Sequence, residues 1–177
     1  MYSAEFERIG KRLFAEHLVG GNFGNISIRE GDGFYIKRTG TCLDVAGEPV
    51  YVPIDGPVSR DASSEYRVHR EVYRKTSYSA IVHAHPPYAI AASLIMNIIE
   101  PEDSEGLMFC PAIPVVGGDP GSDEVARTVS DALVRGKLVI ARGHGTFAAG
   151  QNLDEAYFMT SLAEHSCRVL ALKSAFR

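Results

Sequence analysis

Long hydrophobic runs, basic runs and paired cysteines are all missing from this chain of 177 residues. No apolar stretch reaches the roughly 18 residues that a membrane-spanning helix requires. The first residues are polar and acidic, unlike a signal peptide. The formal net charge is −4 and Lys and Arg form no cluster, so nothing indicates nucleic acid as a partner. We therefore expect a cytoplasmic protein that binds neither membranes nor nucleic acids.

The cysteines are few and unpaired in sequence. Cys42, Cys110 and Cys167 are odd in number and none lies in a CxxC pair, which predicts reduced thiols rather than disulfides. Apolar residues make up 45% of the chain and charged residues 23%, as in ordinary globular proteins. No internal repeat or low-complexity linker divides the sequence. The length suits one core, so we predict a single domain over residues 1–177.

Apolar spacing, N-cap residues and a proline pair together predict five helices, with strand-like segments between them. The expected helices cover residues 3–19, 60–74, 86–97, 122–135 and 152–173. The expected strands cover 26–29, 34–37, 81–85 and 137–141, with further short strands inside 43–58 and 107–116. Ser3 and Ser122 are suited to cap helices, and Asn152 with Glu155 forms a capping-box pattern. Residues 31–33 form a hairpin turn signal.

Two histidines interrupt the apolar run of residues 81–86. A strand turns alternate side chains to one face, so His83 and His85 project together. Paired imidazoles on a rigid strand suit a divalent metal that prefers nitrogen, chiefly zinc. Two ordinary histidines at a strand end would give the same pattern. His144 lies between two glycines after the strand 137–141, where it suits either an open metal site or a turn.

Three segments have features of an anion-binding site. The glycine-rich stretch before Asn25 lets backbone N–H groups converge, although it would also serve as a plain turn. Thr39-Gly40 follows two cations, Lys37 and Arg38, that could equally be a solvated face. Ser63-Ser64 opens a helix whose N–H groups and dipole favour anions.

Two acidic features have ordinary interpretations. Glu65 falls in the first turn of the helix that Ser63-Ser64 opens, where a carboxylate would simply complement the helix dipole. Residues 100–106 hold four carboxylates, which is typical of solvated surface. Neither feature alone indicates a catalytic role.

Five motifs follow one another along the chain: Gly24-Asn25-Ile26-Ser27, Thr39-Gly40, Ser63-Ser64-Glu65, His83-Ala84-His85 and Gly143-His144-Gly145. Together they make the chain resemble the zinc-dependent class II aldolases of the L-fuculose-1-phosphate aldolase and adducin-head type. The resemblance covers nearly the whole chain, and the short members from archaea and thermophiles look nearest in length. It implies an α/β fold of three layers, in which helices cover both sides of a mostly antiparallel central sheet.

The resemblance also implies a role for each motif. His83, His85 and His144 match zinc-binding histidines. Glu65 matches a carboxylate that can ligate the resting metal and serve as acid and base once substrate displaces it. The positions that match phosphate-holding residues are Asn25, Thr39, Gly40, Ser63 and Ser64. One Zn²⁺ per subunit and a homotetramer with active sites at subunit boundaries are implied as well.

The implied reaction is retro-aldol cleavage of a ketose 1-phosphate, of the L-fuculose 1-phosphate type, to dihydroxyacetone phosphate and an aldehyde through a metal-stabilised enediolate. Related branches implied by the resemblance are zinc-dependent epimerases, dehydratases and decarboxylases that act on sugar phosphates. The known aldolases use a tyrosine from a neighbouring subunit as proton donor, whereas residues 100–106 offer carboxylates in that region. A non-catalytic module like the adducin head is disfavoured, because all three histidines are present.

Overall fold

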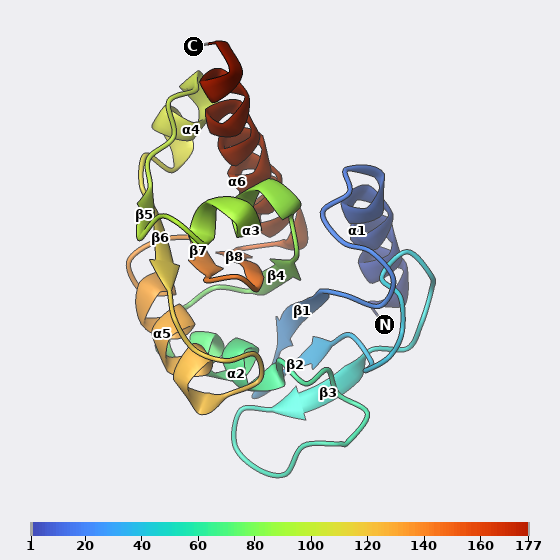
Figure 1. Cartoon of the computed structure of the whole chain (residues 1–177). Helices are drawn as coiled ribbons and strands as arrows, with labels where there is room; N and C mark the ends of the chain where they lie inside the picture. Colours follow the sequence, from blue (N-terminus) through green and yellow to red (C-terminus); the bar gives the residue numbers. More distant parts are fainter. Residues whose placement is uncertain (1, 177) are drawn as a thin grey trace.

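The computed structural model describes residues 2–176 and contains an eight-stranded sheet with helices on both faces (Figure 1). The strands are β1 (Asn25–Glu30), β2 (Gly33–Ile36), β3 (Val50–Pro53), β4 (Ala80–Ala84), β5 (Ile98–Ile99), β6 (Ile113–Val116), β7 (Leu138–Ala141) and β8 (Gly145–Gly150). Their order is β3-β2-β1-β4-β8-β7-β6-β5. Neighbouring strands pair antiparallel except β6 and β7, which are parallel. The predicted mostly antiparallel sheet is therefore confirmed.

The helices form the two outer layers. They are α1 (Ser3–Ala15), α2 (Tyr66–Lys75), α3 (Pro87–Ser93), α4 (Ser104–Phe109), α5 (Asp123–Leu133) and α6 (Leu153–Lys173), followed by a short 3-10 turn (Ser174–Phe176). Helices α2 and α5 pack together on one face of the sheet, while α6 lies on the other face with α1, α3 and α4 around it (Figure 1). This is the three-layer α/β/α arrangement expected. None of the helices described is both long and apolar enough to cross a membrane.

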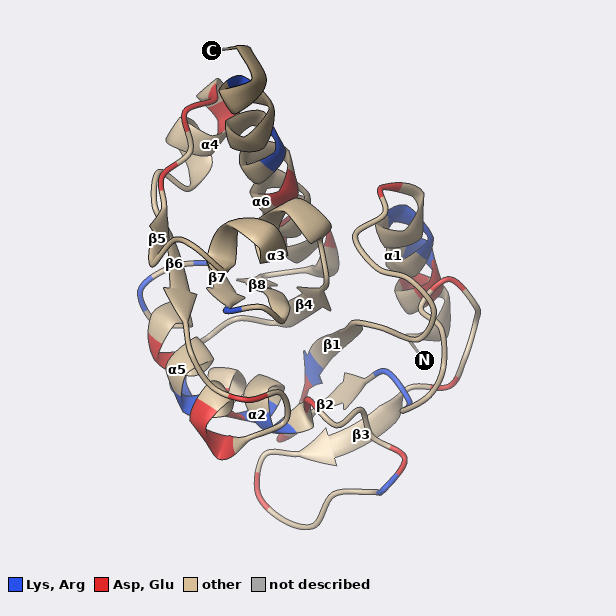
Figure 2. Ribbon diagram, in the orientation of Figure 1, with Lys and Arg blue, Asp and Glu red and all other residues tan. Residues whose placement is uncertain are grey.

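The central strands are buried from both sides, because each helical layer packs on one of their faces. Ile81 of β4 and Phe147 of β8 join the core beneath α2 and α5, whereas Val82 and Ala148 contact the α6 side. Strands β4, β7 and β8 carry no Lys, Arg, Asp or Glu (Figure 2). A histidine at the end of β4 therefore sits at the border between this apolar core and solvent.

The first predicted helix is too long. It ends at Ala15 rather than residue 19, because His17 adopts a left-handed conformation (φ 57°) and the Leu18 N–H donates to the Leu13 carbonyl at 2.9 Å. The prediction that Ser3 caps it is also wrong. Ser3 is the first helical residue, and its hydroxyl donates to the Gly47 carbonyl at 2.9 Å.

The segment from residue 86 to residue 116 differs most from expectation. Helix α3 ends at Ser93 rather than residue 97, and the Asn97 carbonyl instead accepts from the Val115 N–H at the sheet edge. The sequence predicts strand structure from residue 107, but α4 occupies residues 104–109. The Asp103 carboxylate caps this helix by accepting from the Gly106 N–H at 2.8 Å, so part of the acidic segment is structural.

Two of the predicted helix N-caps are confirmed. Ser122 accepts from the Val125 N–H at 3.1 Å, and Asn152 accepts from the Glu155 N–H at 2.8 Å. The Glu155 carboxylate bonds the N–H of Gln151, one residue before the cap, so the capping box is displaced. The cysteines are free thiols, as predicted.

Candidate metal site and anion-binding cleft

Antiparallel pairing brings three distant motifs to one end of β4. Asn25, at the start of β1, pairs with His83 on one side of β4, and Thr146 of β8 pairs with Ala84 on the other. His144 directly precedes β8 and so reaches the same place. The strand order therefore gathers residues that are far apart in the chain.

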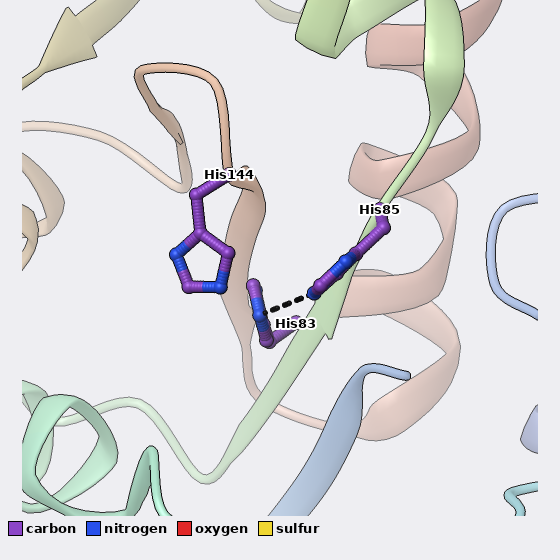
Figure 3. Close-up of side chains that lie close together, drawn as sticks. All are labelled: His83, His85 and His144. Atoms are coloured by element: carbon purple, nitrogen blue, oxygen red, sulfur yellow. Dashed lines mark hydrogen bonds between the residues drawn. The ribbon is translucent and has the colours of Figure 1, made fainter. Parts of the chain in front are cut away.

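The three histidine rings converge on one point (Figure 3). Their centroids lie 4.7–5.1 Å apart, and their candidate ligand nitrogens all fall within 4.8 Å of one another. The His83 and His85 Nε2 atoms are 3.0 Å apart, close to the about 3.3 Å between two imidazole nitrogens on one tetrahedral zinc. The His83 Nδ1–H donates to the Thr146 carbonyl at 2.9 Å, which leaves its Nε2 free as a ligand.

Burial keeps these imidazoles neutral. Burial first, and then the neighbouring histidines, hold the pKa of His83 well below its ordinary value. The pKa of His85 falls to about 4, mainly through burial, and burial lowers the pKa of His144 as well. Neutral imidazoles present lone pairs to a cation, so the set has the protonation state that metal binding requires.

Glu65 reaches the histidines from α2, on a different element from any of them. It stands at the N-cap of α2, its side chain is buried, and its Oε1 is 3.9 Å from His144 Nε2. Burial raises the pKa of this carboxyl. Within residues 2–176, Glu65 Oε2, His144 Nδ1 and Asn25 Oδ1 are buried without a hydrogen-bond partner. Such unsatisfied ligand-type atoms around three neutral imidazoles fit a divalent cation.

The histidines line an open cleft of about 280 Å³. Every residue predicted for the site lines it: Asn25, Thr39, Gly40, Ser63, Ser64, Glu65, His83, His85 and His144. The hydroxyls of Thr39, Ser63 and Ser64 donate to no protein group in the described part of the chain. They therefore remain available to an oxyanion beside the N-terminus of α2.

Comparison with known proteins agrees with this arrangement. Residues 4–171 match the family model for the Class II Aldolase and Adducin N-terminal domain. The chain belongs to this family. It is 32% identical over 165 residues to an L-fuculose phosphate aldolase of Methanococcus maripaludis, covering 90% of this chain and 91% of that protein.

Solved structures give the same result for the fold. The l-fuculose-1-phosphate aldolase from Thermus thermophilus superposes with a TM-score of 0.95 at 35% identity, covering 98% of this chain and 94% of that one. A putative aldolase/epimerase/decarboxylase from Klebsiella pneumoniae gives a TM-score of 0.87 at 27% identity, covering 96% of this chain and 88% of the other. The chain thus has the class II aldolase fold.

Lys37 is the cleft residue whose role sequence reasoning left undecided. It is 6% exposed, and its Nζ donates to the Asn22 and Thr41 carbonyls at 2.7 Å each. Burial lowers its pKa to about 8. The neighbouring Arg38 instead faces the surface in a pair with Asp61. No local sequence signal separates Lys37 from Arg38, because both cations follow the same short strand and only the tertiary structure buries one of them.

Neither the acidic segment 100–106 nor a tyrosine contributes to this cleft within the described residues. The acidic residues Glu100, Glu102, Asp103 and Glu105 do not line the cleft of their own chain. Asp103 and Glu105 instead form a group with His165 on the α4–α6 surface, where Asp103 serves as a helix cap. No tyrosine is among the described residues that line the cleft.

Proposed function

We propose that this class II aldolase-family chain is a zinc-dependent lyase that cleaves a ketose 1-phosphate of the L-fuculose 1-phosphate type. The products would be dihydroxyacetone phosphate and an aldehyde. One observation carries the proposal: a single cleft joins three neutral histidines and a buried carboxylate to the hydroxyls of Ser63 and Ser64. The names of the archaeal and Thermus relatives support it. We further propose that residues 1–177 form one domain.

We assign metal binding to His83, His85 and His144, with Glu65 as a further ligand in the resting site. Zinc bound there would supply Lewis-acid stabilisation of the negative charge that develops beside the substrate carbonyl. Thr146 holds the His83 ring through its carbonyl, and this fixes the tautomer and orientation of one ligand.

Glu65 is the proposed proton-transfer group. In retro-aldol cleavage a hydroxyl loses a proton as the carbon–carbon bond breaks, and the carbon of dihydroxyacetone phosphate gains one. A carboxyl whose pKa is raised by burial is better matched to such transfers near neutral pH than an exposed one. Its free Oε2 leaves one oxygen available to substrate.

The phosphate is proposed to lie against the hydroxyl-bearing residues of the cleft, beside the N-terminus of α2. Asn25, Thr39, Gly40, Ser63 and Ser64 would donate to its oxygens, and the α2 N-terminus would add a favourable dipole. Holding the phosphate there fixes the reacting carbons relative to Glu65 and the histidines.

A second candidate reaction keeps the metal and phosphate roles and replaces cleavage by epimerisation, dehydration or decarboxylation. Two observations favour it: the cleft contains no tyrosine among the described residues, and one solved neighbour is named a putative aldolase/epimerase/decarboxylase. In either reaction the acidic segment 100–106 could act only on the cleft of another subunit.

A homotetramer with sites at subunit boundaries is proposed for the assembly. Exposed apolar side chains lie just after α3 and on α4 and α6: Leu94, Ile95, Leu107, Met108, Phe109 and Phe158. This apolar surface begins close to the cleft, since Leu94 lies against Gly143, next to His144. Covering it with a second copy would bury apolar area. Light scattering of the purified protein tests the assembly, and a monomeric mass would contradict it.

Metal content is the first test of the function. Purified protein should hold about one zinc per chain, and His83→Ala should lose it because the variant lacks one of the three histidine ligands and keeps only His85, His144 and Glu65. His165→Ala is the matched control, because His165 is exposed and outside the cleft. Protein that stays metal-free when zinc is added would contradict both candidate reactions.

The reaction is tested with L-fuculose 1-phosphate and a coupled reductase that detects dihydroxyacetone phosphate. Glu65→Gln should keep most of its zinc and lose turnover by about 100- to 10,000-fold. Glu71→Gln, on the same helix but paired with Arg74 at the surface, should retain turnover. Unchanged turnover in Glu65→Gln would remove Glu65 from the mechanism. Consumption of substrate without triose phosphate would favour the second candidate.

A further inference from the structure

A polar seam joins α2 to β1 beneath the cleft; it consists of the buried residues Ser27, His69 and Tyr73 and the half-buried Arg29. Ser27 Oγ lies 2.6 Å from His69 Nδ1 and 2.7 Å from the Tyr73 hydroxyl. Arg29 donates to the Tyr73 and Thr76 carbonyls at 2.6 and 2.8 Å. The seam therefore ties one face of the helix to one face of the strand.

The seam ends at the cleft on both elements. Alternation along β1 places Asn25 on the same face as Ser27 and Arg29. Four-residue spacing along α2 places Glu65 above His69, and His69 above Tyr73. Glu65 has no side-chain cap bond, and its Oε2 has no protein partner within residues 2–176. Besides its backbone interaction with Gly121, the position of the Glu65 carboxylate depends on where the first turn of α2 rests on the sheet. His69 is the seam residue nearest to that turn.

His69 also contacts the metal side of the site indirectly. Its fully buried ring meets the Phe147 ring edge-on, with centroids 6.3 Å apart. Phe147 in turn stacks on His83, with centroids 4.0 Å apart and planes 12° apart. His69 Nε2 has no hydrogen-bond partner within residues 2–176, so the ring makes one polar side-chain contact, through Nδ1 to Ser27.

We propose that His69 is a positioning residue that sets Glu65 and His83 relative to each other. It does not line the cleft and touches no substrate. Its bond to Ser27 fixes the first turn of α2 against β1. Its ring packs against Phe147, the ring that stacks on His83. The inference rests on the proposed metal and acid–base roles of those two residues.

Only one of the two His69 ring nitrogens has a hydrogen-bond partner within residues 2–176, and this allows a matched pair of variants. His69→Asn places an amide where Nδ1 lies and can keep the bond to Ser27, whereas His69→Gln places it near Nε2, where no partner exists among the described residues. We expect His69→Gln to lower kcat and zinc affinity by about tenfold or more while KM for the sugar phosphate changes little. His69→Asn should recover most of both quantities.

Two further variants separate positioning from general stability. Ser27→Ala removes the same bond from the strand side and should reproduce the loss of kcat. Tyr73→Phe removes the other hydroxyl on Ser27, so it should lower the unfolding midpoint and leave kcat and zinc affinity close to wild type. Cobalt substituted for zinc gives a readout that needs no substrate, since its visible absorption should change in His69→Gln and not in Tyr73→Phe.

Equal losses of kcat in His69→Asn and His69→Gln would overturn the proposal, because packing alone would then explain both. Equal losses in Tyr73→Phe and Ser27→Ala would also overturn it. Wild-type protein that binds neither zinc nor cobalt would instead refute the proposed function, and the positioning role would fail with it. The wild-type result and the variant pattern thus distinguish the two failures.

Discussion

At the scale of single residues, the buried Lys37 links two loops of the cleft. Its ammonium group bridges the loop that carries Asn22 and the loop that carries Thr41, so it holds together two walls of the cleft. Lys37 also lines the cleft together with the proposed phosphate-binding residues Thr39 and Gly40, and its side chain is largely buried. A buried cation of this kind attracts an anion more strongly than a solvated one.

The pKa of Lys37, lowered to about 8 by burial, predicts a pH effect on substrate capture. Lys37 is charged below that pKa and neutral above it, so kcat/KM for a phosphorylated substrate should fall as pH rises through about 8. Lys37→Met should reduce kcat/KM by about 10- to 100-fold, the worth of a hydrogen bond to a charged group, and should flatten this decline.

A profile from about pH 7 to about pH 9.5 measures the effect, because kcat/KM reports groups of the free enzyme. Arg38→Met is the control, since Arg38 faces solvent in a pair with Asp61. A decline of the same size in Lys37→Met would show that another group titrates.

At the scale of elements, the close approach of the loop before β1 to the end of β4 decides where Asn25 and His83 meet. Gly24 adopts φ 71°, and a Cβ there would lie 2.7 Å from the His83 carbonyl oxygen and 2.8 Å from Val19 Cγ1. The backbone of β4 cannot move aside without shifting His83. Glycine is therefore required at this position for both conformation and space.

Gly24→Ala should destabilise the protein by about 2–5 kcal/mol, from left-handed strain and overpacking together. Gly31→Ala is a matched control, because Gly31 has φ 56° but nothing within 4 Å of its added Cβ. It should cost only the strain, about 1–2 kcal/mol. Urea unfolding measures the free energy of unfolding of both variants. Equal decreases in Gly24→Ala and Gly31→Ala would show that the contact with β4 is unimportant.

At the scale of the whole molecule, the two helical layers exclude water from several ionisable groups. His69 has its pKa lowered to about 3 and His85 to about 4, chiefly by burial, and the pKa values of His83 and His144 are lowered too. The ordinary value of 6.5 applies after unfolding. Folding therefore favours the neutral form of four histidines.

Metal-free protein should consequently lose stability as pH falls from about 6.5 toward about 4, because the unfolded chain binds more protons there. The raised pKa of Glu65 and Glu164 opposes this, but with fewer groups. The urea midpoint should be lower at about pH 5 than at about pH 7.5. His165→Ala, at an exposed site, should leave the difference between the two urea midpoints unchanged. Equal midpoints in the unmodified protein would contradict the prediction.

The sequence by itself determined the features that depend on neighbours in the chain. Ser122 and Asn152 cap their helices as predicted, because a cap needs only a residue a few positions away. The alternation around His83 and His85 was enough to place both rings on one face. The order of the five motifs was enough to identify the family.

Only the tertiary structure decided which of these local features meet. Strand order pairs Asn25 with His83. Strand order and helix packing together bury Lys37 and place the acidic segment 100–106 outside the cleft of its own chain. Hydrophobic periodicity sets the face of each element but not its neighbour. The use of Asp103 as a cap and of His69 as a link between α2 and β1 became visible only with those neighbours in place.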